Sequence, residues 1–401
     1  MRRDWTRRGL VAAGAAAALG GGMLARPAPT QPAAPPLVVE KRVFEAGSYR
    51  TRGGDTIANV RIGYQTAGRL NAAGDNAVLI SHFFSGNSHA FGRLGGGDGP
   101  PGWWDAIIGP GKAIDTERWF VVAADNLVNV NAADPNTTTT GPATTDPATG
   151  RPYGLSFPVV SLRDFVEVHR RLVDHLGIRR LALVAGPSNG GLNTIEWAAA
   201  YPEMVERAMP VIAGELDAWL QGWLDIWAAP IRLDPNWRNG DYYGREPPLR
   251  GLAEAWKIVT LQAQDRAWTR QFNRRVAQGQ DPARRLGDRF EIERVLDAAG
   301  AARARATDAN SFLYMVRANQ LFLNEYPSLE AAVSRSRARW LVVPAATDWI
   351  FPPGAVDELV EALRRHGRPV EVAPLGGDRG HLDGLFGIAQ AAERIRAFLA
   401  A

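Results

Sequence analysis

Ser188 stands in the stretch VAGPSNGG, which contains the spacing Gly-x-Ser-x-Gly. This spacing alone is common by chance, but here it follows an apolar run that predicts a strand and precedes a stretch that predicts a helix. A strand-serine-helix turn is typical of a nucleophile elbow, in which small neighbours permit a strained serine backbone. The first amides of the helix would face a developing negative charge. We therefore expect Ser188 to act as a nucleophile.

A serine hydroxyl needs a base, and the base needs an acid that orients it. In enzymes with this elbow the chain order is serine, acid, histidine, and only His366 and His381 follow Ser188. His366 lies near the end of a charged helical stretch, EALRRHGR, which favours a solvated surface histidine. His381 lies in a glycine-rich loop, GGDRGHLDG, directly after a predicted strand. We expect His381 to be the general base, with an exposed loop histidine as the alternative.

Asp348 is the expected acid because it directly follows the apolar strand in RWLVVPAATD. Its rivals Asp378 and Asp383 lie within three residues of His381, a spacing that suits hydrogen bonds inside the loop better than an orienting contact. A surface aspartate in a turn is the alternative for Asp348.

Two backbone amides are needed to bind the oxyanion of an acyl-transfer intermediate. One is expected from Asn189, which follows the serine, and the other from the loop SHFFSGNSH after the strand at 77–82. His82 and His89 in this loop have no third ligand pattern nearby, so we expect no metal site. The chain has no cysteine, which excludes a thiol nucleophile, disulfides and cysteine-bound zinc.

The composition is that of a globular protein, with 46% hydrophobic and 22% charged residues in a chain of 401. Residues 1–36 differ, with an arginine-rich start, an Ala/Gly run and a Pro/Ala linker, and the stretch TRRGLV resembles a twin-arginine signal. This segment predicts export to the periplasm, or a membrane anchor if it is not cleaved. Because it carries most of the net charge of +4, the charge gives no support for nucleic-acid binding.

The rest of the chain alternates apolar runs with helical stretches, which predicts an α/β fold with a mostly parallel sheet covered by helices. The expected strands are 77–84, 118–125, 180–186, 208–213, 339–348 and 370–376. The expected helices are 161–177, with Ser161 as N-cap, 191–202, 355–367 and 389–400.

A helical cap is expected at residues 214–335, inserted into a sheet domain formed by 37–213 and 336–401, because this segment is too long for a loop. Trp219, Trp223 and Trp227 recur every fourth residue in it, so they share one helix face. This face either packs on the core or forms an apolar wall over a pocket.

Several stretches together resemble a known family, in order along residues 40–400. GYQTAGRLN, SHFFSGNSHAFG, AGPSNGGLNTIEWAAAYP, DPNWRNGDYY, DANSFLYMVRA and TDWIFPP are similar to signature stretches of the homoserine O-acetyltransferase family, a branch of the α/β-hydrolases. The resemblance implies an α/β-hydrolase fold and ping-pong acyl transfer by Ser188, Asp348 and His381. It also implies the Phe84 and Asn189 amides as the oxyanion hole, and a possible homodimer through the cap.

At the positions that bind the substrate in this family, the chain has different residue types. The family's acyltransferases usually carry an Arg and, seven residues on, a Tyr, where GLAEAWKIVTLQAQ has Trp256 and Ala263. They also carry an Asp after the catalytic histidine, where this chain has Leu382. Without these partners the charges of a bound amino acid would be uncompensated, at a cost of several kcal/mol per ion. Homoserine is therefore an unfavourable acceptor, and Trp256, Ala263 and Leu382 predict an apolar substrate pocket.

These residues together predict a serine ester hydrolase that acts on a small acyl ester or thioester without a cofactor. The alternatives are an O-acyltransferase, to homoserine or another alcohol, and a non-catalytic binding protein on the same scaffold. An acyltransferase and a hydrolase share the acyl-serine and differ only in the acceptor.

Overall fold

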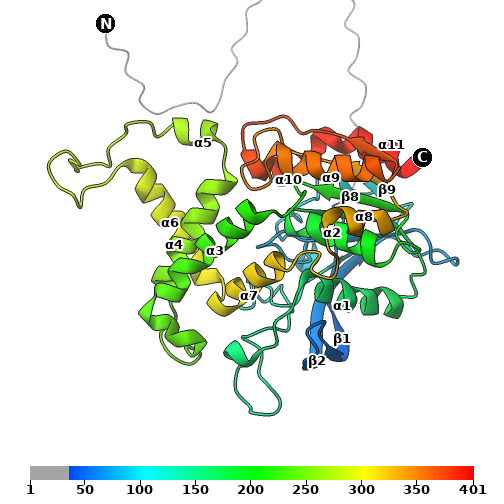
Figure 1. The fold of residues 1–401 in the computed structure, drawn as a ribbon, viewed down its shortest axis with the longest axis horizontal. Coiled ribbons are helices and arrows are strands. Elements are labelled where there is room, and N and C mark those ends of the chain that lie inside the picture. Colours follow the sequence, from blue (N-terminus) through cyan, green and yellow to red (C-terminus); the bar gives the residue numbers. More distant parts are fainter. Residues whose placement is uncertain (1–35) are drawn as a thin grey trace, which may run out of the picture. The chain divides into compact units, whose positions relative to one another are not determined.

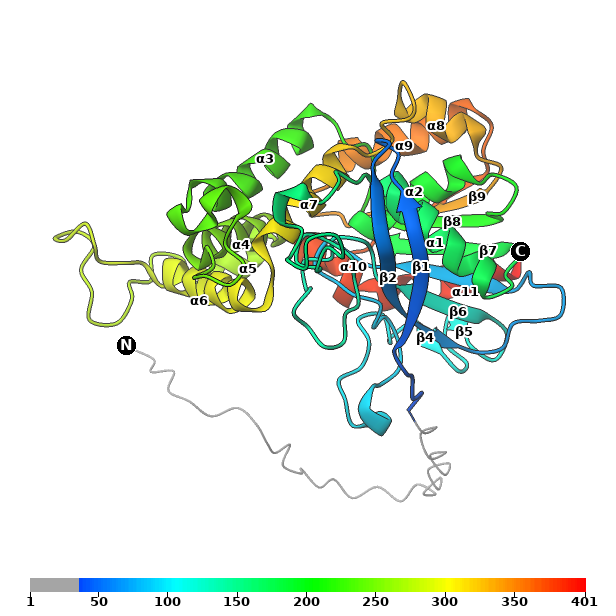
Figure 2. The ribbon, with the colours of Figure 1, turned by 90° about the horizontal axis from the view of Figure 1, so that it is seen from below.

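Figures 1 and 2 show a computed structural model of the chain, which describes residues 36–401. The expected export signal and its linker lie outside the described residues, apart from Pro36. None of the helices in the described part combines the length and the apolar character needed to cross a bilayer.

The main sheet of residues 36–401 has eight strands in the order β1-β2-β6-β3-β7-β8-β9-β10. From β6 to β10 all neighbours are parallel, whereas β1 pairs with β2, and β2 with β6, in antiparallel fashion. The bounds are β1 (Arg42–Arg50), β2 (Thr56–Ala67), β3 (Ala77–Ser81), β6 (Phe120–Ala124), β7 (Leu181–Pro187), β8 (Arg207–Val211), β9 (Arg339–Val342) and β10 (Val370–Val372). Two short strands, β4 (Ile108–Gly109) and β5 (Ile114–Asp115), pair separately.

Each apolar run that predicted a strand contains one, and the expected mostly parallel sheet is confirmed. The strands β3 and β9 end several residues before the expected bounds, because their last apolar residues already belong to loops at the carboxyl edge. Central strands such as β3, β7 and β8 are buried along their whole length, which explains their continuous apolar sequence. The hairpin β1–β2 was not expected, because its burial is irregular and much of it is exposed.

Helices cover both faces of the sheet. The expected helices are present as α1 (Leu162–His175), α2 (Asn189–Ala200), α9 (Pro353–Arg365) and α11 (Ala392–Ala400). Ser161 caps α1 as expected: its side chain accepts from the Asp164 N–H, and Asp164 accepts from the Ser161 N–H at 2.7 Å. The apolar residues of α1, α2 and α9 join one core cluster and those of α11 join another, so the two faces of the sheet are buried separately.

The segment between β8 and β9 is helical, and Figures 1 and 2 show most of it on one side of the sheet domain. Its helices are α3 (Ala218–Leu233), α4 (Leu249–Ala263), α5 (Arg266–Arg270), α6 (Glu291–Ala306), α7 (Ala309–Gln320) and α8 (Leu329–Arg335). Helix α4 packs between α3 and α6, and α7 packs on α3, whereas α8 packs on α2 and α9 of the sheet domain.

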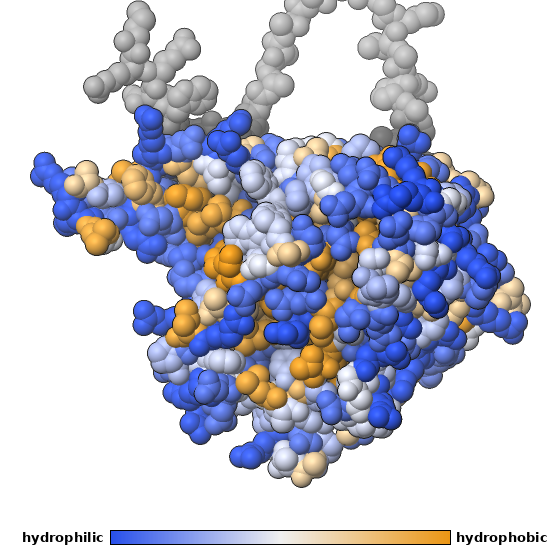
Figure 3. Space-filling model, viewed as in Figure 1, coloured by the Kyte–Doolittle hydropathy of each residue, from blue (hydrophilic) through white to orange (hydrophobic). Residues whose placement is uncertain are grey.

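The three tryptophans of α3 differ in their surroundings. Trp219 is 46% exposed, Trp223 is partly buried, and Trp227 is buried with its ring centroid 5.7 Å from that of Phe84. Figure 3 shows apolar residues gathered on the central part of one face of the molecule, with hydrophilic residues around them. Of these three tryptophans, Trp227 is the one whose ring packs against Phe84 in the loop after β3. The homodimer that the family resemblance implies stays a prediction.

Candidate active site

Ser188 lies in a sharp turn between β7, which ends at Pro187, and α2, which begins at Asn189. Its φ of 57° and ψ of −119° are unusual for a residue with a side chain, and they store backbone strain. The neighbouring glycines permit the turn, because a Cβ at Gly190 would lie 2.1 Å from the carbonyl oxygen of Ser81. The Ser188 N–H donates to the Val211 oxygen at 2.9 Å and anchors the turn to β8.

Asp348 and His381 form a buried hydrogen bond, with 2.7 Å between Oδ2 of the aspartate and Nδ1 of the histidine. The other carboxylate oxygen, Oδ1, accepts from the N–H groups of Ile350 at 2.8 Å and Phe351 at 3.0 Å. These donors fix the carboxylate, so Nδ1 of His381 carries a proton and donates it. The ring of Phe351 stacks near the imidazole with 6.2 Å between centroids. Nε2 of His381 is then the nitrogen that can accept a proton.

Ser188 follows β7, Asp348 follows β9 and His381 follows β10, so all three lie at the carboxyl edge of the parallel strands. Side chains for binding and catalysis gather at this edge in open α/β sheets. The hydrogen bonds of residues 36–401 include no bond between Ser188 Oγ and His381.

The rival residues lie in other surroundings. His366 is at the C-terminal end of α9, where Nε2 lies 3.2 Å from Oε1 of Glu330 at the surface. Asp383 accepts from the Arg379 N–H at 3.2 Å, a local contact within the loop, and Asp378 is exposed.

The loop after β3 is fixed by His82, which sequence reasoning considered only as a metal ligand. Its Nε2 accepts from the Asn126 N–H at 3.1 Å, so the proton is on Nδ1, which donates to the Phe83 oxygen at 2.7 Å. Complete burial lowers the pKa of His82 to about 4, so the ring is neutral. The carbonyl and N–H of a trans peptide point in opposite directions. His82 therefore sets the direction of the Phe84 N–H.

The Phe84 and Asn189 N–H groups donate to no acceptor within residues 36–401. Asn189 is the first residue of α2, where a helix offers no internal partner for an N–H. Its side-chain amide donates to the His82 oxygen at 3.3 Å and so links the serine turn to the loop after β3. Two free N–H donors thus belong to two segments that touch beside Ser188.

His89, the second histidine of this loop, has both ring nitrogens within reach of oxygens. Nδ1 lies 3.2 Å from Oε1 of Gln65, and Nε2 lies 3.0 Å from the Pro100 oxygen. No group of three potential metal-binding side chains occurs in the described part of the chain.

The three positions expected to form a substrate pocket lie near these elements. Trp256 is fully buried, its ring is 6.2 Å from that of Phe84, and its Nε1 donates to Thr307 at 2.8 Å. Ala263 ends α4 against the His381 loop, where its carbonyl oxygen lies 3.0 Å from the place of a Cβ on Gly380. Leu382, next to His381, is partly buried against the apolar core.

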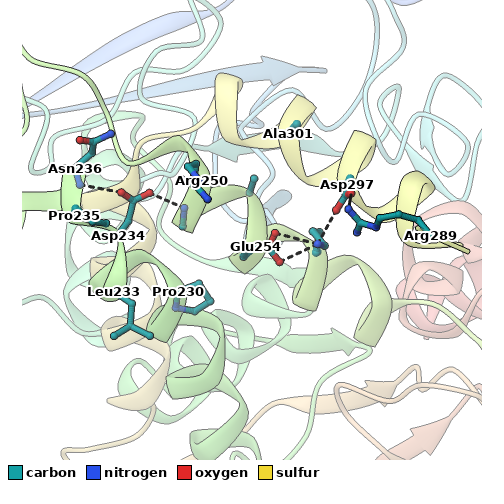
Figure 4. Close-up of a pocket in the computed structure, with 13 residues that line it drawn as sticks. Pro230, Leu233, Asp234, Pro235, Asn236, Arg250, Glu254, Arg289, Asp297 and Ala301 are labelled. Atoms are coloured by element: carbon teal, nitrogen blue, oxygen red, sulfur yellow. Dashed lines mark hydrogen bonds and ion pairs between the residues drawn. The ribbon is translucent and has the colours of Figure 1, made fainter. Parts of the chain in front are cut away.

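A separate hollow of about 810 Å³ lies among α3, α4 and α6, and Figure 4 shows its lining. Lys257 pairs with Asp297 at 2.7 Å and with Glu254 at 2.9 Å, and Arg289 also pairs with Asp297 at 2.7 Å. Ser188, Asp348 and His381 do not line it. These charged side chains pair with each other, and the lining includes no serine, threonine or histidine, so this hollow offers no group for the chemistry expected of Ser188.

The sheet order and the serine turn define the class of the protein. The family profile described as alpha/beta hydrolase fold matches residues 77–384, so the chain is an α/β-hydrolase-fold protein. Within this class it belongs to the homoserine O-acetyltransferase family. The homoserine O-acetyltransferase of Methanococcoides burtonii is 37% identical over 84% of this chain and 68% of the relative. That of Deferribacter desulfuricans is also 37% identical, over 86% of this chain and 91% of the relative.

Two solved structures are similar over nearly the whole described chain. Esterase E22 has a TM-score of 0.87 and 42% identity, with 90% of this chain and 100% of the esterase covered. The homoserine O-acetyltransferase of Bacillus anthracis has a TM-score of 0.87 and 34% identity, with 91% and 98% covered. The expected fold and family are confirmed, and the protein is an enzyme of the hydrolase or acyltransferase kind.

Proposed function

We propose that this enzyme transfers acyl groups through an acyl-serine intermediate on Ser188, with His381 as general base and Asp348 as the residue that orients it. The observation that carries the proposal is the buried 2.7 Å hydrogen bond between Asp348 and His381, at the sheet edge that also carries the strained serine turn. A serine activated by an oriented histidine attacks esters and thioesters.

In the first half of the reaction, Ser188 Oγ bonds to the acyl carbon while its proton moves to Nε2 of His381. The carbonyl oxygen becomes an oxyanion, which accepts hydrogen bonds from the Phe84 and Asn189 N–H groups. The bond from the acyl carbon to the leaving oxygen or sulfur then breaks, and His381 returns the proton to the leaving group. The acyl group stays on Ser188.

In the second half, we propose that water is the acceptor, which makes the enzyme an ester hydrolase. Water gives a proton to His381, its oxygen bonds to the acyl carbon, and the proton returns to Ser188 as the acid leaves. The apolar Trp256, Ala263 and Leu382 support this acceptor, because these three side chains carry no charge that could pair with the ammonium or the carboxylate of an amino acid. The similarity to esterase E22 supports it too.

Acyl transfer to an alcohol is the second candidate. It is favoured by the curated relatives, which are named homoserine O-acetyltransferase and match over most of this chain. The first half of the reaction is the same for both candidates. An alcohol oxygen then takes the place of water, and the product is a new ester instead of an acid.

The test combines active-site labelling with an acceptor series. Intact mass after fluorophosphonate treatment is expected to show one adduct on wild type and none on Ser188→Ala. Ester turnover that ignores added homoserine or other alcohols supports hydrolysis, and turnover that rises with an acceptor and yields a new ester supports transfer. Absence of the adduct, with Ser188→Ala as active as wild type, would refute the acyl-serine and favour a binding protein.

A further inference from the structure

Arg303 is a cation of α6 that reaches the loop after β3. Its Nη2 donates to Ser85 Oγ at 2.8 Å, and its guanidinium lies over the ring of Trp256, with Cζ 3.6 Å from the ring centroid. Ser85 directly follows Phe84, whose N–H we assign to the oxyanion. A positive charge from helix α6 therefore lies beside the proposed oxyanion hole.

This cation has no counter-charge in the described part of the chain. No carboxylate pairs with Arg303, and its Nε and Nη1 donate to no protein acceptor, whereas Lys257 and Arg289 in the same segment pair with Asp297. Burial lowers the pKa of Arg303 to about 10, and no carboxylate raises it. The group is still protonated at neutral pH. A partly buried guanidinium without an anion is unfavourable, and an incoming anion relieves this cost.

The free side of the guanidinium defines the kind of anion. Arginine presents its N–H groups as a planar fork that matches a carboxylate with two parallel hydrogen bonds. Stacking on Trp256 holds the plane of this fork, so little side-chain entropy is lost when an anion binds. The Trp256 ring, which the sequence predicts to line an apolar substrate pocket, therefore has a cation on its face.

We propose that Arg303 binds a carboxylate on the substrate, so that the preferred substrate is an anionic ester instead of a purely apolar one. This inference rests on the proposed acyl transfer at Ser188 and names the substrate class of the same site. The carboxylate belongs to the acyl part or to the alcohol part of the ester, and both sources present the same group to Arg303.

Two matched ester pairs test the proposal. The mono-p-nitrophenyl ester of adipate and its terminal carboxamide differ in charge on the acyl side. The pair para-acetoxybenzoate and para-acetoxybenzamide differs on the alcohol side. Wild type is expected to prefer the anionic member of at least one pair in kcat/KM. Arg303→Met is expected to lower this preference about 10- to 100-fold, mainly through KM, as for loss of a hydrogen bond to a charged group.

Arg305→Met is the matched control, because Arg305 is an exposed arginine on the same helix and its loss removes the same charge. It is expected to keep the wild-type preference. Arg303→Lys keeps the charge without the fork, so we expect an intermediate preference, and it replaces Arg303→Met if the latter does not fold. Wild type without preference for either anionic ester, or an unchanged preference in the folded Arg303 variant, would overturn the proposal.

A purely structural role for Arg303 makes a different prediction. If the cation only fastens the loop through Ser85, then Ser85→Ala and Arg303→Met lower kcat/KM equally for both members of each pair, and this result refutes anion binding. Fluorophosphonate labelling of wild-type Ser188 separates the two levels of inference. Labelling with a flat charge preference refutes only the role of Arg303, whereas absence of labelling refutes the acyl-serine itself.

Discussion

At the scale of single residues, both carboxylate oxygens of Asp348 accept hydrogen bonds, not only the one that faces His381. One oxygen accepts from the imidazole and the other from two backbone N–H groups. These three donors stabilise the charged carboxylate and leave it one orientation. The carboxylate in turn keeps the proton of His381 on Nδ1, which leaves Nε2 free to accept the proton that the proposed mechanism takes from Ser188.

Asp348→Asn tests this arrangement. The amide has the shape of the carboxylate but not its charge, and it can donate to Nδ1, which moves the imidazole proton to Nε2. By analogy with serine-histidine-aspartate enzymes, we expect kcat to fall by about three to four orders of magnitude while the protein stays folded. Burst and steady-state kinetics measure the loss, with Asp378→Asn, an exposed aspartate in the loop of His381, as the control. Turnover close to wild type would assign the orienting acid to another residue.

At the scale of elements, the loop after β3 and the start of α2 act together. The neutral His82 fixes the Phe83 carbonyl, and Asn189 binds the His82 carbonyl, so the two proposed oxyanion donors are positioned through one buried residue. His82 does not contact the reacting atoms on this account. It is a positioning residue.

His82→Ala removes the hydrogen bond to Phe83 and frees the Phe83–Phe84 peptide to rotate. Since loss of one oxyanion donor costs about 10²- to 10³-fold in kcat, we expect a decrease of at most this size. KM is expected to change little, because the oxyanion forms only during the reaction. His89→Gln in the same loop serves as the control. A change in KM alone, with kcat kept, would limit His82 to a role in folding.

The elements also show what sequence could predict. The apolar runs, the Gly-x-Ser-x-Gly turn and the order of serine, acid and histidine place Ser188, Asp348 and His381 at one sheet edge. Local patterns determine these features. The contact of Arg303 with Ser85 joins residues 218 positions apart, so no local sequence pattern predicts it. The same holds for His82, whose partner Asn126 follows a neighbouring strand.

At the scale of the whole molecule, the sheet domain and the helical segment share one apolar core. The same buried cluster contains Val184 and Leu192 of the sheet domain and Trp227, Trp256 and Phe312 of the helical segment. Glu196 of α2 adds a polar link, because its Oε1 accepts from the Leu323 N–H at 2.7 Å. Helix α2, which follows Ser188, and the segment after α7 are thus linked by a buried carboxyl group.

This link predicts a dependence of stability on pH. Burial raises the pKa of Glu196 to about 7, so the folded state prefers the protonated acid. Its folded pKa lies above the unfolded one, so this contribution is fully present below about pH 4.5 and is lost as pH rises through 7. His82 and His169, each with a pKa lowered by burial to about 4, act in the opposite sense, and their contribution is lost as pH falls from 6.5 through 4.

Because the histidines act in the opposite sense, we isolate Glu196 by comparing wild type with Glu196→Gln, and we expect wild type to lose roughly 3 kcal/mol of stability relative to this variant between pH 5 and 9. Glu196→Gln keeps an oxygen for Leu323 but cannot ionise. It keeps both histidines, so their contribution cancels in the difference between the two proteins. Urea denaturation at pH 5, 7 and 9 measures both proteins, with the exposed Glu393→Gln as control. Parallel curves for wild type and Glu196→Gln would mean that the carboxyl group stays ionised in the fold, and that solvent or a cation such as Arg163 compensates its charge.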